Sequence, residues 1–318
     1  SRASVVYNGL CTYQDNLNIQ VRDKVNTINK YGKQILELND AISRIECGGV
    51  EHANDLRDAR NEILDELSRL CKMSYSADSL GHVSVQLEGV DFVKGGMCYE
   101  IGMQQDATTG FYTPFWPQNA EYTIMQDGSK NYDITHAKVF DLEQTVSSTM
   151  DTDIGGLKAS LLARGDHRAN YSDIEKDYDS ISQSIVMNIQ AEFDQLIHNV
   201  ATSINKVLAD ACDPSREYLC DRDGSPLQLF QKVTTDGYVK KDDGAGNETW
   251  EYMKEDFSSP DTMYTINNLK INSHLLQEPS MLGFMLADGK ADYKTGEALK
   301  AAFTEESYRL NPNVQKKT

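Results

Sequence analysis

Two stretches of this 318-residue chain are apolar on one helical face over a length that few compact domains accommodate. Between residues 13 and 47 the apolar positions recur at intervals of three, four and seven, a heptad pattern with Gly32 in one slot. A second run, from 172 to 211, keeps steps of three or four throughout and predicts one helix of roughly 60 Å at about 1.5 Å per residue. The pattern therefore favours an elongated, helical protein. The heptad positions of the first run are Val21, Val25, Ile28, Ile35, Leu38, Ile42 and Ile45.

A shorter helix is predicted to follow the first one after a Gly48-Gly49 pair, which ends helices well. Asn54 is a suitable N-cap, and Asp55 and Asp58 lie where the helix dipole favours negative charge. Because the connection is short, the two helices are expected to pack antiparallel.

After Met73 the hydrophobic pattern changes from helical periodicity to the alternation that is typical of strands. Residues 83–87 alternate strictly between apolar and polar, and a Glu88-Gly89 turn leads to a second candidate strand at 90–93. Further strands are predicted at 97–103, 121–125 and 137–141, which indicates a small β domain.

Helical patterning returns at 155–164. The stretch 212–263 is polar and rich in turns, with hairpin residues around Tyr238 and Trp250. An extended piece at 264–271, a short helix at 280–286 and a last helix at 295–308 are predicted to complete the chain.

The sequence therefore predicts an α+β fold: an elongated rod of long antiparallel, coiled-coil-like helices, a small antiparallel β domain and a second β-hairpin excursion. Five segments are expected. They are the first part of the rod at 1–73, the β domain at 74–145, the central rod at 146–211, the hairpin excursion at 212–263 and a returning segment at 264–318.

The charge balance limits the classes of partner that the chain can bind. The chain has 31 Lys and Arg against 49 Asp and Glu, a net charge of −18. This charge repels nucleic acid and anionic membranes, and no internal basic patch offsets it. No apolar run approaches the ~20 residues of a membrane span, and the Ser1-Arg2-Ala3-Ser4 start does not resemble a secretion signal.

The cysteines show no metal-binding spacing. They are spread over the chain without a CxxC pair, and free buried thiols are the simplest interpretation. Only Cys212 and Cys220 lie close enough in sequence to suggest a local disulfide. The others are Cys11, Cys47, Cys71 and Cys98.

No pattern of catalytic or cofactor-binding residues is present. The histidines are isolated, without HxH or HExxH, and no nucleophile elbow or glycine-rich nucleotide loop occurs. Asp221 and Asp223 resemble the start of a calcium loop, but Ser225, Leu227 and Leu229 do not continue it. The sequence predicts neither an enzyme nor a cofactor, with Asp221 and Asp223 as a weak Ca²⁺ candidate only.

Four segments resemble, in the same order, the flagellar hook-associated protein 1 family (FlgK). Residues 25–40 resemble the helix that precedes the family's helix-start signature, and residues 54–68 resemble that signature. Residues 155–166 are similar to the segment after the family's β region, and residues 269–280 to its later "N-P-x-L…D-P-S" stretch, with Ser273 in place of the first Pro. The positions that carry the resemblance are Asn54, Asp55, Leu56, Arg57, Asp58, Arg60, Leu64, Leu67, Gly155, Gly156, Leu161, Leu162, Arg164, Asp166, Asn272, Pro279 and Ser280.

The resemblance implies a structural role at the junction of hook and filament, with copies packed in a ring. It implies the hook protein and hook-associated protein 3 as neighbours, a cytoplasmic export chaperone that binds the family's C-terminus, expected to be absent from this chain, and extracellular placement through signal-free type III export. Family members carry terminal polymerisation helices that this chain is expected to lack, as a truncated core.

A cell-surface adhesin or host-binding module remains an alternative. Its ligand would be held by aromatic residues of the β domain. These are Tyr99, Phe111, Tyr112, Phe115, Trp116 and Tyr122.

Overall fold

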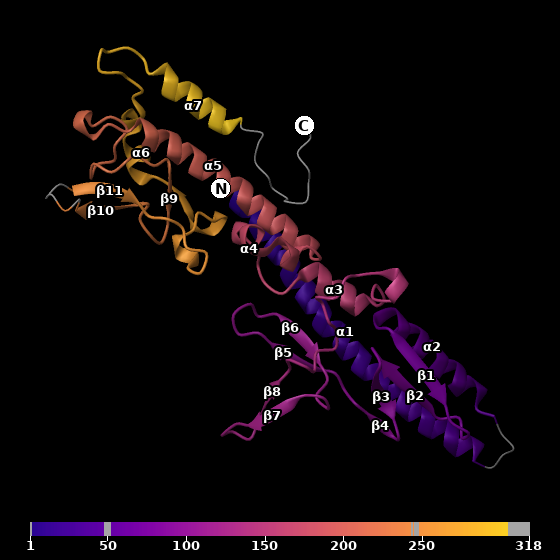
Figure 1. The fold of residues 1–318 in the computed structure, drawn as a ribbon. Coiled ribbons are helices and arrows are strands. Elements are labelled where there is room, and N and C mark those ends of the chain that lie inside the picture. The colour runs from indigo at the N-terminus through magenta and orange to yellow at the C-terminus, as the bar shows by residue number, and fades with distance from the viewer. Residues whose placement is uncertain (1, 48–51, 243, 245–247, 305–318) are drawn as a thin grey trace. The chain divides into compact units, whose positions relative to one another are not determined.

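The computed structural model describes residues 2–47, 52–242, 244 and 248–304, and Figure 1 shows the fold. The chain divides into two compact units, which are described separately below. The first-described unit comprises residues 10–168 and 182–187, and the second comprises residues 1–9, 169–181 and 188–318. Gly48-Gly49 and the predicted helix end near residue 308 lie outside the described residues.

The long helix α1 (Arg2–Glu46) buries a face that repeats every three and four residues. Not all positions of this face are apolar. Asn39 takes the slot after Ile35, whereas Ile45 is exposed and Leu38 only half-buried, so the predicted assignment of those two residues to the buried face was wrong. The buried face comprises Tyr7, Cys11, Gln14, Asn18, Val21, Val25, Ile28, Gly32, Ile35, Asn39 and Ile42.

Helix α2 (Asn54–Leu70) runs antiparallel to α1, as predicted, because Arg57 pairs with Glu46 while Arg60 reaches back to Asn39. Its N-cap is Ala53 and not Asn54, which is the first helical residue. Helix α3 (Gly156–Arg164) adds Leu157 and Leu161 to the same core.

A four-stranded antiparallel sheet in the order β1-β2-β3-β4 packs its apolar face into this core. Two further hairpins follow along the chain (Figure 1). The strands are β1 (Met73–Ala77), β2 (Val83–Leu87), β3 (Val90–Lys94), β4 (Met97–Cys98), β5 (Gly102–Gln105), β6 (Tyr112–Phe115), β7 (Glu121–Ile124) and β8 (Lys130–Asp133).

The β region differs from the sequence prediction in five places. Strands β1 and β8 were not predicted. The predicted strand at 97–103 is split between β4 and β5, and the one at 137–141 is reduced to a single bridge between Lys138 and Phe115. Strand β6 was not predicted because Pro114 argues against a strand, yet Pro114 pairs with Met103 and its carbonyl accepts from Val139 N.

The predicted helix over 172–211 is interrupted. It forms α4 (Tyr171–Ile181), which has non-helical backbone at Asp177, and α5 (Ile185–Ala211). Polar side chains satisfy backbone groups here in place of helical bonds: Asp177 Oδ1 accepts from Asp179 N, and Ser184 Oγ accepts from Met187 N. The apolar period continues across the break, which is why periodicity alone did not show it.

In the second unit, α5 packs a smaller apolar cluster that includes Leu208, Leu219, Leu227 and Leu275. Two short antiparallel pairs, β9 with β12 and β10 with β11, accompany it. Their bounds are β9 (Phe230–Lys232), β10 (Tyr238–Asp242), β11 (Glu248–Tyr252) and β12 (Leu269–Ile271). The remaining helices are α6 (Ser273–Gln277) and α7 (Tyr293–Phe303).

The 3-10 turns η1 (Ser148–Met150), η2 (Pro214–Arg216), η3 (Pro260–Thr262), η4 (Ile266–Asn268) and η5 (Pro279–Leu282) connect these elements. The helix predicted at 280–286 is limited to η5. It ends at Gly283 and is followed by Phe284 in a left-handed conformation, with φ of 21°.

Gly32 sets how closely α1 approaches the β region. A Cβ at this position would lie 2.5 Å from the Phe92 ring and 2.6 Å from Cys98 Sγ, whereas a Cβ at Gly9 of the same helix would meet nothing within 4 Å. Of these two glycines of α1, packing therefore requires only Gly32.

We expect Gly32→Ala to lower the free energy of unfolding by about 1–3 kcal/mol, because the methyl group forces Phe92 and the sheet away from α1. Gly9→Ala is the matched control and should raise stability by about 0.5–1 kcal/mol through helix propensity. Urea unfolding followed by circular dichroism measures both changes. Equal effects of the two substitutions would show that the close approach at Gly32 is not needed.

Candidate functional site

Three asparagines on α1 each hydrogen-bond to the backbone of the β region through both the nitrogen and the oxygen of the side-chain amide. Asn29 Nδ2 donates to Ile101 O at 2.9 Å while Ile101 N donates to Asn29 Oδ1 at 2.8 Å. Asn39 makes the same pair with Val83, at 2.8 and 3.1 Å. Asn18 contacts two residues instead of one. Its Nδ2 donates to Gly110 O at 3.0 Å, and its Oδ1 accepts from Tyr112 N at 2.8 Å. We call these pairs the asparagine clamps.

The clamps work because a carboxamide offers one donor edge and one acceptor edge, like a peptide group. An extended residue turns its N–H and C=O to the same side, so one asparagine satisfies both. The three asparagines lie eleven and ten residues apart, close to three helical turns, and therefore share one face of α1.

Sequence reasoning missed the clamps, because asparagine on a helix usually lies in solvent. The available signal was that Asn18 and Asn39 occupy slots of the three-and-four-residue repeat, where a polar residue needs a partner.

Two buried arginines, both among the positions that carry the resemblance, hydrogen-bond to the asparagines of the outer clamps. Arg60 Nη1 donates to Asn39 Oδ1 at 2.7 Å and to Gly81 O at 2.9 Å. Arg164 Nη1 donates to Asn18 Oδ1 at 2.7 Å and to Tyr112 O at 2.9 Å. Burial lowers the pKa of Arg60, and that of Arg164 to about 10, so both remain charged at neutral pH.

Gly155 lets the start of α3 lie against the end of α2. Its φ is +103°, and a Cβ would lie 2.7 Å from Leu70 O. Lys24 of α1 then reaches α3 by donating to Gly156 O at 2.9 Å.

Other positions that carry the resemblance fall into three groups by exposure. Leu64, Leu67 and Leu161 are core residues, and Leu56, Arg57, Gly156 and Leu162 are half-buried. The exposed members, which the structure does not bring into the clamps, are Asn54, Asp55, Asp58, Asp166, Pro279 and Ser280.

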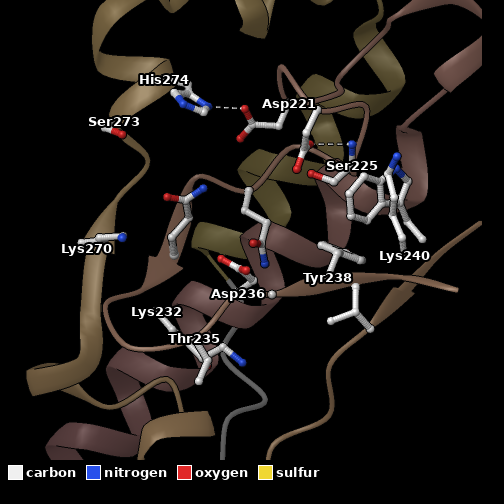
Figure 2. Close-up of a pocket in the computed structure, with 16 residues that line it drawn as sticks. Asp221, Ser225, Lys232, Thr235, Asp236, Tyr238, Lys240, Lys270, Ser273 and His274 are labelled. Atoms are coloured by element: carbon white, nitrogen blue, oxygen red, sulfur yellow. Dashed lines mark hydrogen bonds and ion pairs between the residues drawn. The ribbon is translucent and has the colours of Figure 1, made fainter.

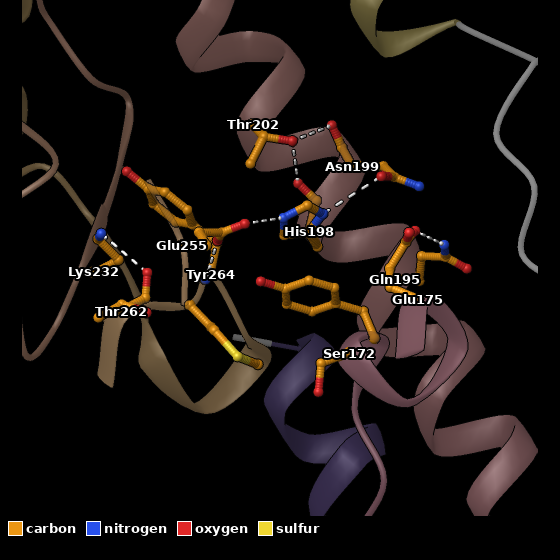
Figure 3. A network of polar contacts seen from close by, with 12 residues as sticks. Ser172, Glu175, Gln195, His198, Asn199, Thr202, Lys232, Glu255, Thr262 and Tyr264 are labelled. Carbon is orange, nitrogen blue, oxygen red and sulfur yellow. Dashed lines mark hydrogen bonds and ion pairs between the residues drawn. The ribbon is translucent and has the colours of Figure 1, made fainter. Parts of the chain in front are cut away.

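The second unit has a buried polar network around α4 and α5 (Figure 3). Asp194 accepts from Tyr171 N at 3.1 Å and from Ile266 N at 2.7 Å. His198 lies 2.8 Å from Glu255 and stacks on the Tyr171 ring at 3.9 Å. A fourth clamp recurs here, since Asn205 exchanges two hydrogen bonds with Phe230 at 2.6 and 3.0 Å.

The two carboxylates of this network differ in their pKa. Burial raises the pKa of Asp194 from the ordinary 3.8 to about 6, although its two backbone donors act in the opposite direction. Burial also acts to raise the pKa of Glu255, but the hydrogen bond and charge of His198, together with hydrogen bonds from Tyr264 N and Tyr171, hold that pKa below its usual value.

A polar cavity of about 500 Å³ lies in the same unit (Figure 2). Asp221 at its edge accepts from Asn272 Nδ2 at 2.7 Å and contacts His274 Nδ1, and Asn272 also caps α6 through His274 N. Asp223 accepts from Ser225 N at 2.9 Å. The two carboxylates of the weak Ca²⁺ candidate are thus each engaged by protein donors, and within the described ranges no three His, Cys, Asp or Glu residues are grouped to hold a metal.

The aromatic residues that the adhesin alternative requires are mostly inside. Phe111, Phe115 and Trp116 are buried, and Tyr99 and Tyr112 are half-buried, which leaves Tyr122 exposed. The structure therefore gives that alternative no support.

In both units the buried polar side chains hold chain segments to one another. The family model described as "Flagellar hook-associated protein FlgK helical domain" matches residues 1–217. The chain therefore belongs to this family, which confirms the family and the α+β fold predicted from the sequence.

Two curated relatives show the extent of the similarity. The chain is 22% identical over 305 residues to flagellar hook-associated protein 1 of Escherichia coli K12, covering 89% of this chain and 54% of the relative. It is 24% identical over 244 residues to the protein of the same name from Salmonella typhimurium LT2, covering 72% and 42%. The chain thus spans about half the length of the curated relatives that it matches.

A solved structure is also similar, the flagellar hook junction protein FlgK from Burkholderia pseudomallei. Its TM-score is 0.47 at 20% identity, over 73% of this chain and 34% of that one. Of the helices in the described part of the chain, none has the length and apolarity needed to cross a membrane.

We expect Asn29→Ala to lower the free energy of unfolding by about 1–3 kcal/mol, because Ile101 loses partners for both of its backbone groups in a buried place. Asn29→Asp should cost at least as much, since a carboxylate cannot donate to Ile101 O. Asn26→Ala, at an exposed position of the same helix, is the control and should change stability by less than about 0.5 kcal/mol. A loss at Asn29 no larger than at Asn26 would contradict the clamp interpretation.

The raised pKa of Asp194 makes stability depend on pH. The folded state binds the carboxyl proton of Asp194 more tightly than the unfolded state does. The stability that this proton contributes is therefore fully present below pH 3.8 and is lost as the pH rises through about 6. Asp194→Asn cannot titrate. The stability of the wild type relative to the variant should therefore fall by up to about 3 kcal/mol between pH 3.5 and 7.5. Unfolding of both proteins at the two pH values measures this, and a constant difference would show that folding does not raise the pKa of Asp194.

Proposed function

We propose that this chain is a structural component of the bacterial flagellum and forms part of the junction between hook and filament. The observation that carries the proposal is the match of residues 1–217 to the FlgK helical domain. The physical design agrees with it, because the clamps and their arginines brace the β region against α1 internally. A subunit that transmits force needs this internal rigidity.

The proposal includes packing of identical copies into a ring, with the hook protein and hook-associated protein 3 as axial neighbours. Large apolar side chains exposed on α1 and the β region offer area for such contacts. They are Tyr13, Ile19, Tyr75, Leu80, Tyr122 and Ile124. The net charge of −18 argues against nucleic acid and membrane surfaces as alternative partners.

Localisation outside the cell, by type III export without a cleaved signal peptide and with help from a cytoplasmic chaperone, is part of the same proposal. The role is structural and involves no catalysis or cofactor. Within it, Arg60 and Arg164 serve as internal braces, which accounts for their burial, and the positive φ of Gly155 permits the close approach of α3 to α2.

Immunogold electron microscopy of intact flagella tests the proposal, with antibodies raised against residues 1–318. We expect gold particles confined to the boundary between hook and filament, because a junction ring occupies only that site. Cells that lack the gene provide the control for non-specific label. Label along the cell wall, or none on flagella, would contradict the proposal.

A further inference from the structure

A pair of thiols lies at the end of α5, in the second unit. Cys212 Sγ and Cys220 Sγ are 3.1 Å apart, only about 1 Å beyond the covalent S–S length of about 2.05 Å. Cys212 is half-buried and Cys220 is 9% exposed, and both are free thiols in this structure.

The backbone between the two cysteines holds this geometry. Asp213 and Tyr218 form a bridge in both directions, at 2.9 and 3.1 Å, and the Asp213 side chain accepts from Ser215 N. Cys220 in turn forms a bridge to Pro226. The sulfurs are therefore brought together by the fold and not only by their closeness in sequence.

The loop also contains backbone strain. Glu217 and Leu219 have φ of 51° and 50°, in the left-handed region that side chains other than glycine disfavour. Leu219 is buried with Leu208 of α5 and Leu227 in the second apolar cluster. This cluster fixes the strained loop against the end of α5, with the two thiols at its base.

The geometry points to a dithiol that closes to a Cys212–Cys220 disulfide when it meets a low-molecular-weight disulfide oxidant such as oxidised glutathione. The Cys212 thiolate attacks one sulfur of the oxidant, which forms a mixed disulfide and releases one glutathione thiolate. The Cys220 thiol loses its proton to solvent and attacks the Cys212 sulfur, which forms the S–S bond and releases the second glutathione. The protein loses two electrons and two protons, and the oxidant gains them.

Closure ties the last turn of α5 covalently to the segment that leads into β9. Because the loop is short and its ends are already in place, the bond removes freedom mainly from the unfolded chain. Burial, the neighbouring Cys220 thiol and the Asp213 carboxylate raise the pKa of Cys212. Few Cys212 thiolates are therefore present at neutral pH. Because the thiolate is the attacking species, the assay is run for hours at pH 8.5.

The test uses the Cys47→Ser protein, which removes an exposed thiol that would join two molecules. The folded protein is incubated with oxidised glutathione, its remaining thiols are alkylated, and it is digested with trypsin without reduction. Cleavage after Lys206, Arg216 and Arg222 separates the two cysteines. The disulfide therefore appears as peptide 207–216 linked to peptide 217–222, two hydrogens lighter than their sum, and dithiothreitol removes it.

We expect the linked peptides to account for most Cys212, with an equilibrium constant about tenfold or more above that of the same chain in guanidinium chloride. The unfolding midpoint should rise by about 5 °C on oxidation. In Cys220→Ser, Cys212 should be recovered as the glutathione mixed disulfide or alkylated, with no rise in midpoint. Recovery of Cys212 mainly as the alkylated form in the Cys47→Ser protein, or equal constants in folded and unfolded chains, would overturn the inference.

Discussion

The pairing of asparagine side chains with extended backbone is the interaction on which the helix-and-sheet unit depends. The strands there are only two to five residues long, too short to hold their own register firmly. A buried N–H or C=O without a partner is costly, and residues at the start of these strands or directly before them bury such groups against α1. Asn29 and Asn39 each satisfy both groups of one residue, so each fixes one point of the β region along the helix. Apolar contacts alone would permit sliding by a turn.

Because α1 uses polar side chains for these pairings, its buried face has fewer apolar residues. Gln14, Asn18 and Asn39 take slots of the repeat that an apolar residue would otherwise fill. A polar residue in such a slot lowers stability and specifies a single register, because any shift leaves its amide unpaired. Gln14 follows the same logic by donating to the carbonyls of Arg164 and His167, at 2.7 and 2.8 Å.

This logic also separates what the sequence predicted from what it did not. The apolar period alone was sufficient to predict the middle of α1 and the strands β2 and β3. In β2, for example, Val83, Val85 and Leu87 alternate into the core. It failed wherever a polar side chain substitutes for a backbone partner: Ser184 starts a new helix, Asp177 distorts one, and Asn39 occupies a slot assigned to Leu38. The resemblance pointed to Arg60 and Arg164, but their acceptors on α1 lie tens of residues or more away in sequence and no local pattern marks them. Sequence reasoning therefore found the arginines and missed what they bind.

The buried arginines and the outer clamps depend on each other. Neither Arg60 nor Arg164 forms an ion pair with a carboxylate among the described residues. Each places its charge on neutral oxygens, those of Asn39 and Gly81 or those of Asn18 and Tyr112. The loss of any of these acceptors is costly for a buried cation. Asn29 has no such cation, so its clamp is worth only its own two hydrogen bonds. The ends of the β region are therefore more firmly fixed to α1 than its middle.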